Sequence, residues 1–182
     1  MRSSIFKLVA VSLFFSWALN AARADQVAPL EFGPFELLPS GDGMVMVGAG
    51  EYNAFRQRDP GEVGASSVLN LEYRFGRKFF YLGFALGGLA NTDGGKFVYL
   101  GNYADIRYRR IIVTPLLSVG AYSRGSGPDL GGTLQFRSAV TVDYEFDNRS
   151  RLGVRLAHTS NASIHDENPG LNEILFTYAF PF

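Results

Sequence analysis

The sequence predicts an all-β protein, an eight-stranded antiparallel up-and-down transmembrane β-barrel. From Met44 onward, large apolar side chains occupy every second position in segments of about ten residues, which is the period of a β-strand. Short and long connections alternate between these segments, as they do in barrels whose strands run up and down across a membrane. The chain also ends in a segment with aromatic residues on one face, closed by Phe182.

The composition is that of one folded domain. The 182 residues are 47% hydrophobic and 14% aromatic, which excludes a disordered chain. Lys plus Arg and Asp plus Glu number 17 each, so the excess of positive charge that nucleic-acid binding requires is missing. The chain contains no Cys, which excludes disulfides, thiolate metal sites and cysteine nucleophiles.

Residues 1–24 have the pattern of a secretory signal peptide. A basic segment up to Lys7 precedes an apolar run from Leu8 to Leu19, and Ala22-Arg23-Ala24 offers a peptidase site. The apolar run is too short to span a hydrocarbon core of about 30 Å as a helix. We therefore expect the mature chain, residues 25–182, to form the barrel domain. Residues 25–40 then either plug the periplasmic mouth or begin the first strand.

Eight segments show the alternation, most clearly Thr133 to Phe146, where one face is apolar and the other carries charges. The predicted strands are 44–54, 66–75, 79–90, 97–108, 110–123, 132–146, 151–160 and 172–182. Short turns near 76–78, 109 and 147–150 belong to the periplasmic side, and the longer loops at 55–65, 124–131 and 161–171 lie outside the cell. Pro115 predicts a bulge or bend in the fifth strand.

The period alone does not say which face is inside. Two alternatives to a transmembrane barrel are a soluble lipocalin-like barrel, which would have an apolar interior, and another soluble secreted all-β domain. Small residues at Gly83, Ala85 and Gly87 favour a narrow polar lumen with the apolar face turned to lipid. The lumen would then hold paired ions. Its expected charged members are Glu72, Arg74, Arg137, Asp143, Glu145 and Arg155.

The last strand supports a membrane location. Ile174, Phe176, Tyr178, Phe180 and Phe182 share one face. A terminal aromatic residue on such a strand resembles the signature of outer-membrane barrels in Gram-negative bacteria, and aromatic rings favour the headgroup boundary. The outer membrane of a Gram-negative bacterium is therefore the expected location.

Candidate catalytic residues lie at the outer end of the seventh strand. His158 and Ser160 share a face, with their Cα atoms roughly 7 Å apart, so an imidazole nitrogen could reach the hydroxyl. That face also carries Leu156, so both side chains point toward lipid. Asn172 has the same parity on the last strand and could hydrogen-bond the ring of His158, whereas Glu173 faces the lumen.

These residues resemble a known family. His158-x-Ser160-Asn161-Ala162, followed by Asn168-Pro169-Gly170, is similar to the PagL family of lipid A 3-O-deacylases, also described as acyloxyacyl hydrolases. The resemblance implies an outer-membrane serine esterase that acts on lipopolysaccharide without a cofactor or metal. Ser160 would be the nucleophile and His158 the base, and Asn161 would support activity by helping to stabilise the oxyanion. The substrate bond would be the ester of the 3-hydroxyacyl chain at position 3 of lipid A.

The chain departs from the family at the third member of the triad. The family has Glu at the position of Asn172, and Glu173 follows one residue later. We therefore expect Ser160, His158 and Asn172 to act together, while a bulge near Leu171 would bring Glu173 to the site instead. A non-catalytic barrel with a structural or adhesion role is the alternative function, and a lumen-facing acyltransferase is a more distant one.

Other polar residues fall in the predicted outer loops. His165, Asp166 and Glu167 resemble metal ligands, but solvated loop residues are the better interpretation because a site needs three or four converging ligands. Four basic loop residues could contact the phosphates of lipid A. They are Arg56, Arg58, Lys96 and Arg124. Outer-membrane lipids are the expected surroundings, no nucleic acid is expected as a partner, and a homodimer stays open.

Overall fold

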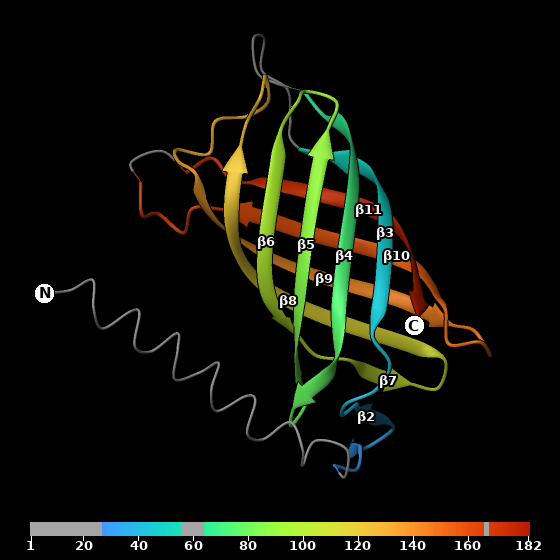
Figure 1. Ribbon diagram of the computed structural model, residues 1–182. Helices are drawn as coiled ribbons and strands as arrows, with labels where there is room; N and C mark the ends of the chain where they lie inside the picture. The colour runs from blue at the N-terminus through green and yellow to red at the C-terminus, as the bar shows by residue number, and fades with distance from the viewer. Residues whose placement is uncertain (1–26, 56–63, 166–167) are drawn as a thin grey trace, which may run out of the picture.

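The computed structural model describes residues 27–55, 64–165 and 168–182. These residues form strands joined by turns and loops (Figure 1). The strands are β1 (Leu30–Phe32), β2 (Phe35–Leu37), β3 (Met44–Tyr52), β4 (Ser66–Phe79), β5 (Leu82–Asn91), β6 (Lys96–Tyr103), β7 (Ile106–Tyr108), β8 (Ile111–Ser123), β9 (Leu134–Glu145), β10 (Arg151–Ser160) and β11 (Leu171–Pro181). The predicted signal peptide lies outside the described residues. Within them, no helix is long and apolar enough to cross a membrane.

Eight of the strands close into an antiparallel barrel, which confirms the predicted fold class. Pairing runs in the order β3, β4, β5, β6, β8, β9, β10 and β11, and β11 pairs with β3 to close the ring. The connections after β3, β5, β8 and β10 lie at one end, called the loop end here. The connections after β4, β7 and β9 and the chain terminus at Phe182 lie at the other, called the turn end (Figure 1).

Two predicted boundaries were wrong, both at the turn end. β4 continues to Phe79 across an irregularity in register between Arg74 and Lys78, so the turn falls at Phe80 rather than at 76–78. The predicted strand 97–108 is broken after Tyr103, and Asp105 turns inward to pair with Lys78 at 2.8 Å. These buried ions decide where the strands stop, because each needs a partner across the barrel.

The structure differs from the prediction at Pro115 and rules out one of the two alternatives for residues 25–40, within their described part. β8 keeps its register with β9 through Pro115, so the predicted bulge is missing from the fifth strand. The break lies instead in the neighbouring strand, between β6 and β7, beside the position where Pro115 has no N–H to donate. Residues 30–37 form a hairpin, β1 and β2, that pairs with β7 at the turn end rather than beginning the barrel wall (Figure 1).

Ion pairs fill the interior, as predicted, together with aromatic rings that the sequence analysis did not place there. Glu72 accepts from Arg74 and Arg155 at 2.8 Å each. Gly83 and Gly87 face Tyr103 and Tyr99, and a Cβ at either glycine would overlap the tyrosine ring. The buried cations are Arg74, Lys78, Arg137, Arg151 and Arg155, and the buried anions are Glu72, Asp105, Asp143 and Glu173. The narrow lumen is therefore a packed polar core.

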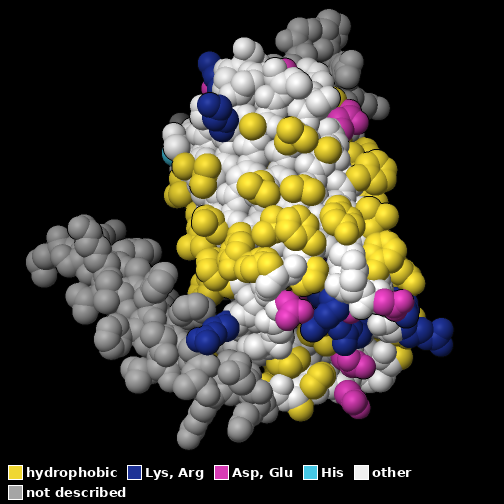
Figure 2. Space-filling view, turned by 45° about the vertical axis from the view of Figure 1, so that its right-hand side comes forward, with side chains coloured by type: hydrophobic (Ala, Val, Ile, Leu, Met, Phe, Trp, Pro, Cys, Tyr) yellow, Lys and Arg dark blue, Asp and Glu magenta, His cyan; other side chains and the backbone are white. Residues whose placement is uncertain are grey.

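The outer face is an apolar belt between charged ends (Figure 2). Large apolar side chains on this face are widely exposed, as Leu69, Leu117 and Phe176 show at 68%, 70% and 71%. Such a continuous apolar surface around a barrel matches contact with lipid and excludes the lipocalin-like polarity. The aromatic residues of the final strand contribute to this belt, with Phe176, Tyr178, Phe180 and Phe182 all exposed.

Candidate active site on the outer wall

The candidate catalytic residues lie on the outer wall at the loop end. Ser160 is the last residue of β10, His158 precedes it by two positions, and Asn172 is the second residue of β11. The alternation of each strand turns His158 and Asn172 outward, where both are exposed, while Ser160 is half-buried. The structure thus brings to one patch of the lipid-facing wall the three residues that parity had predicted there.

His158 contacts Asn172 directly. The two residues are paired across β10 and β11, and His158 Nδ1 lies 2.9 Å from Asn172 Oδ1. Because an amide oxygen only accepts hydrogen bonds, Nδ1 carries the proton in this arrangement. The other ring nitrogen, Nε2, is then unprotonated in the neutral ring and able to accept a proton, as a general base must.

Glu173 lies on the opposite side of the wall. Its carboxylate is buried and accepts from Arg137 Nε at 3.2 Å and from Arg137 Nη2 at 2.7 Å, with Thr159 Oγ1 donating at 3.3 Å. The register between β10 and β11 runs without interruption from Thr159 opposite Leu171 to Arg151 opposite Ala179. The bulge that would bring Glu173 to His158 is therefore not formed.

Asn161 contacts a neighbouring loop. Its side chain is buried and its Nδ2 donates to the carbonyl of Leu130 at 2.8 Å, in the loop between β8 and β9. Its main-chain N–H donates to Asn168 Oδ1 at 3.0 Å. The carboxamide of Asn161 therefore holds the two loops together rather than pointing toward lipid, because the alternation of β10 turns position 161 inward. That Asn161 helps to stabilise the oxyanion stays a prediction.

Gly170 packs closely against His158, a contact that the sequence analysis did not predict although Gly170 belongs to the motif. It has a left-handed φ of +60°, and a Cβ at this position would lie 2.8 Å from Cε1 of His158. The backbone of the last loop therefore packs against the imidazole edge that carries Nε2. An Asn-Pro-Gly sequence just before a strand is the signal that could have pointed to this close approach.

We expect Gly170→Ala to lower the rate of any reaction that uses His158 by about 10- to 100-fold, because a misplaced base loses its alignment with the nucleophile. Gly33→Ala is the matched control, since Gly33 has a similar φ of +62° but no atom within 4 Å of the added Cβ. Initial rates and the urea midpoint of both variants would be compared. Equal rates for the two variants would contradict the contact.

Ser138 is a polar residue on the outer wall that sequence analysis passed over. It is exposed on β9 and lies directly opposite His158 in the β9–β10 register. Its parity is that of Leu134, Phe136, Val140 and Val142, all apolar and exposed. A small serine between Phe136 and Val140, on a face otherwise made of large apolar and aromatic side chains, is the signal that could have found it.

Three of the predicted loop residues, His165, Lys96 and Arg124, fall within the described part of the chain. His165 packs against Gly132 of the neighbouring loop, and Asp166 and Glu167 lie outside the described residues, within which no group of three or more metal-ligating side chains converges. Arg124 forms an ion pair with Asp129 at 2.7 Å, and Lys96 begins β6 at the loop end. Arg56 and Arg58 lie outside the described residues.

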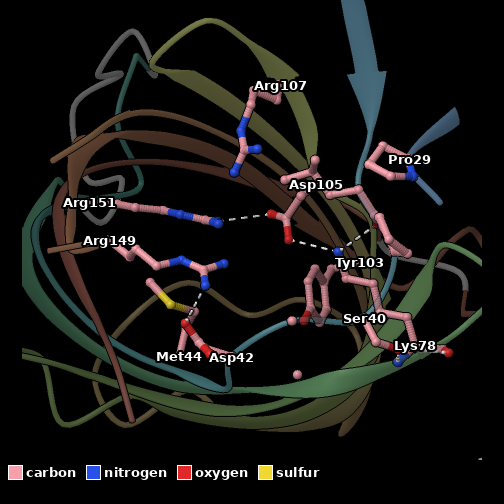
Figure 3. Close-up of a pocket in the computed structure, with 14 residues that line it drawn as sticks. Pro29, Ser40, Asp42, Met44, Lys78, Tyr103, Asp105, Arg107, Arg149 and Arg151 are labelled. Atoms are coloured by element: carbon pink, nitrogen blue, oxygen red, sulfur yellow. Dashed lines mark hydrogen bonds and ion pairs between the residues drawn. The ribbon is translucent and has the colours of Figure 1, made fainter. Parts of the chain in front are cut away.

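A cavity of about 200 Å³ lies at the turn end (Figure 3). It is lined by Arg151 at the start of β10, whereas His158 lies near the other end of that strand. Its charged side chains are already paired: Arg151 with Asp105 at 3.1 Å and Arg149 with Asp42 at 3.0 Å. These groups close the turn end by neutralising one another, and the lining has no nucleophile paired with a base. The outer-wall patch is the better candidate for chemistry.

Known proteins share the fold of this chain. A crystal structure of the outer membrane enzyme PagL matches with a TM-score of 0.60 and 20% identity, covering 76% of this chain and 99% of that one. Neisserial surface protein A matches with a TM-score of 0.52 and 14% identity, covering 77% of this chain and 97% of that one. These likenesses concern the fold.

The sequence relationship is more specific. The lipid A deacylase PagL of Bordetella bronchiseptica is 34% identical over 53 residues, which is 29% of this chain and 30% of that protein, so the match spans less than a third of the relative. The family described as lipid A 3-O-deacylase (PagL) matches residues 35–181, almost the whole barrel. The chain therefore belongs to the PagL family of lipid A 3-O-deacylases.

Proposed function

We propose that this protein is an outer-membrane serine esterase that removes the 3-O-linked hydroxyacyl chain from lipid A of lipopolysaccharide. The observation that carries the proposal is the 2.9 Å contact between His158 and Asn172 on the lipid-facing wall, two residues from Ser160. Family membership gives the substrate class. A site open to lipid rather than to the lumen suits an amphiphile that stays in the outer leaflet and approaches sideways.

In the proposed reaction, Ser160 Oγ attacks the ester carbonyl while His158 Nε2 accepts its proton. The resulting imidazolium keeps its Nδ1–H bonded to Asn172 Oδ1 and returns the other proton to the sugar oxygen as the C–O bond breaks. Water then attacks the acyl-enzyme with His158 again as the base, which releases the hydroxy fatty acid and restores Ser160.

The oxyanion needs hydrogen-bond donors close to Ser160. With the carboxamide of Asn161 bound to Leu130, we assign this task to main-chain N–H groups of the following turn. Ala162 and Ser163 both have left-handed φ values there, 53° and 61°. Two successive residues held in this conformation are costly for non-glycine side chains and are found preferentially at functional sites.

Mass spectrometry of lipid A after incubation with the refolded mature protein tests the proposal. We expect a product that lacks one hydroxyacyl chain, together with the free hydroxy fatty acid in equal amount. Lipid A that already lacks the 3-O-linked chain is the control substrate and should stay unchanged. Lipid A that still carries its 3-O-linked chain after long incubation with correctly folded protein would contradict the proposal.

We expect Asn172→Glu to raise the deacylation rate by about tenfold, because a carboxylate binds the imidazolium more strongly than a neutral amide by about 1.4 kcal/mol. Asn172→Ala should lower the rate, since Nδ1–H loses its acceptor. Glu173 stays unchanged in both variants, so the interior ion pair with Arg137 is preserved. A rate for Asn172→Glu no higher than that of Asn172→Ala would argue against Asn172 as the partner of His158.

A further inference from the structure

Ser138 places a hydroxyl inside the apolar belt beside the candidate active site. On β9 it is exposed on the outer face, with Phe136 and Val140 as its outward neighbours on the same strand. Across β8 it lies opposite Leu117, which is 70% exposed. Leu134 and Phe136 both lie nearer the loop end than Ser138 does. The hydroxyl therefore lies below two apolar residues of its strand, within the depth that contacts acyl chains.

A hydroxyl at this depth needs a hydrogen-bond partner. Burying one in hydrocarbon without a partner costs free energy, because lipid offers no replacement for water. The main chain of β9 is already paired with β8 on one side and β10 on the other through this position. A polar group on the acyl chain of a bound lipid would provide the missing partner.

The register places Ser138 where such a group would pass. In the register of β9 and β10, Ser160 lies opposite Phe136, and His158 lies opposite Ser138. Ser138 is therefore the diagonal neighbour of Ser160, two residues farther from the loop end. Diagonal neighbours are about 7–8 Å apart. An acyl chain whose carbonyl is attacked by Ser160 and which runs toward the middle of the membrane passes this row. A hydroxyl on its third carbon is two C–C bonds and one C–O bond from the carbonyl carbon, within hydrogen-bond reach of Ser138.

We propose that Ser138 hydrogen-bonds the 3-hydroxyl of the acyl chain that is transferred to Ser160. This contact makes the enzyme prefer 3-hydroxyacyl esters over unsubstituted acyl esters of the same length. This inference rests on the proposed function, since it assumes that Ser160 attacks the ester carbonyl. Ser138 takes no proton and forms no covalent bond. It determines specificity by contact with the substrate.

Two synthetic glucosamine lipids that differ only in the 3-hydroxyl of the 3-O-linked chain test the inference. Initial rates in mixed micelles give kcat/KM for each lipid with the refolded protein. We expect Ser138→Ala to lower kcat/KM for the hydroxylated lipid by about three- to tenfold, the range for one neutral hydrogen bond, and to leave the other lipid unchanged. Ser138→Thr keeps a hydroxyl and should retain the preference. Ser67→Ala removes an exposed hydroxyl from β4, opposite Glu51, and is the matched control.

The outcomes separate this inference from the proposed function. A preference for the hydroxylated lipid that is lost in Ser138→Ala and kept in Ser138→Thr and Ser67→Ala would establish it. Equal wild-type rates on the two lipids, or an equal loss on both in Ser138→Ala, would overturn it while leaving the esterase activity in place. Hydrolysis of neither lipid by the wild-type protein would contradict the proposed function and the inference with it.

Discussion

Ser160→Ala should abolish deacylation of lipid A, with a fall in rate of about 10³-fold or more. The reason is that the alanine side chain has no oxygen to attack the ester, and removal of the nucleophile from a triad costs as much as removal of the whole triad. The oxyanion donors and the lipid-binding surface would remain, so any residual rate would come from water attacking a bound ester. Mass spectrometry of lipid A over a time course measures the remaining activity.

Folding of the Ser160 variant has to be established separately. Ser160 is the last residue of β10 and half-buried, and its side chain contributes little to the packed interior. We therefore expect the same urea midpoint as for the wild-type barrel. Ser67→Ala, another serine near the loop end, should keep full activity. Unchanged deacylation by a folded Ser160→Ala protein would exclude Ser160 as the nucleophile. No deacylation by the folded wild-type protein would favour the alternative function, a barrel with a structural or adhesion role.

Glu72→Gln should destabilise the barrel by about 3–5 kcal/mol, the range for breaking a buried ion pair. Glu72 is fully buried and accepts from Arg74, from both terminal nitrogens of Arg155 and from the hydroxyl of Tyr99 at 2.7 Å. A neutral amide would leave two buried guanidinium groups short of negative charge, and its NH₂ group would face donors. Urea unfolding of the refolded protein in detergent, followed by tyrosine fluorescence or circular dichroism, measures the change.

Glu51→Gln is the control for this change. Glu51 is a carboxylate on the neighbouring strand β3, but it is exposed on the outer face at the loop end and has no ion pair among the described residues. Its replacement should shift stability by no more than about 0.5 kcal/mol, as is usual for surface positions. Similar midpoints for the two variants would show that the lumen admits enough water to solvate Arg74 and Arg155.

The interior and the outer wall are linked through β10 and β11. Arg137, Thr159 and Glu173 join β9, β10 and β11 from inside, while His158, Asn172 and Ser138 project from the same three strands outside. The polar interior thus fixes the register that brings the outer residues together. A site on paired strands is held more rigidly than one on loops, which suits an imidazole that must stay within hydrogen-bond reach of its partners.

Much of the fold could be predicted because the period of a strand is local. Alternating apolar and charged residues from Thr133 to Phe146 predicted the strand and its two faces, and the same parity placed His158, Ser160 and Asn172 on one wall. Glycines at 83 and 87 indicated a narrow lumen, and they face tyrosines there. These inferences needed only the order of side chains along one strand.

Other features depended on residues far apart in the chain. Asp105 ends β6 because it meets Lys78 and Arg151, and neither partner is local to it. The β1–β2 hairpin forms against β7, and Asn161 turns to Leu130 rather than to lipid. The sequence therefore determined the barrel and the face of the candidate site through the alternation of apolar residues, and the polarity of the barrel through its small and charged residues. Strand ends, loop contacts and the absence of a bulge that would have brought Glu173 beside His158 were decided by the tertiary structure, because cross-strand register and buried ion pairing arise only when the barrel closes.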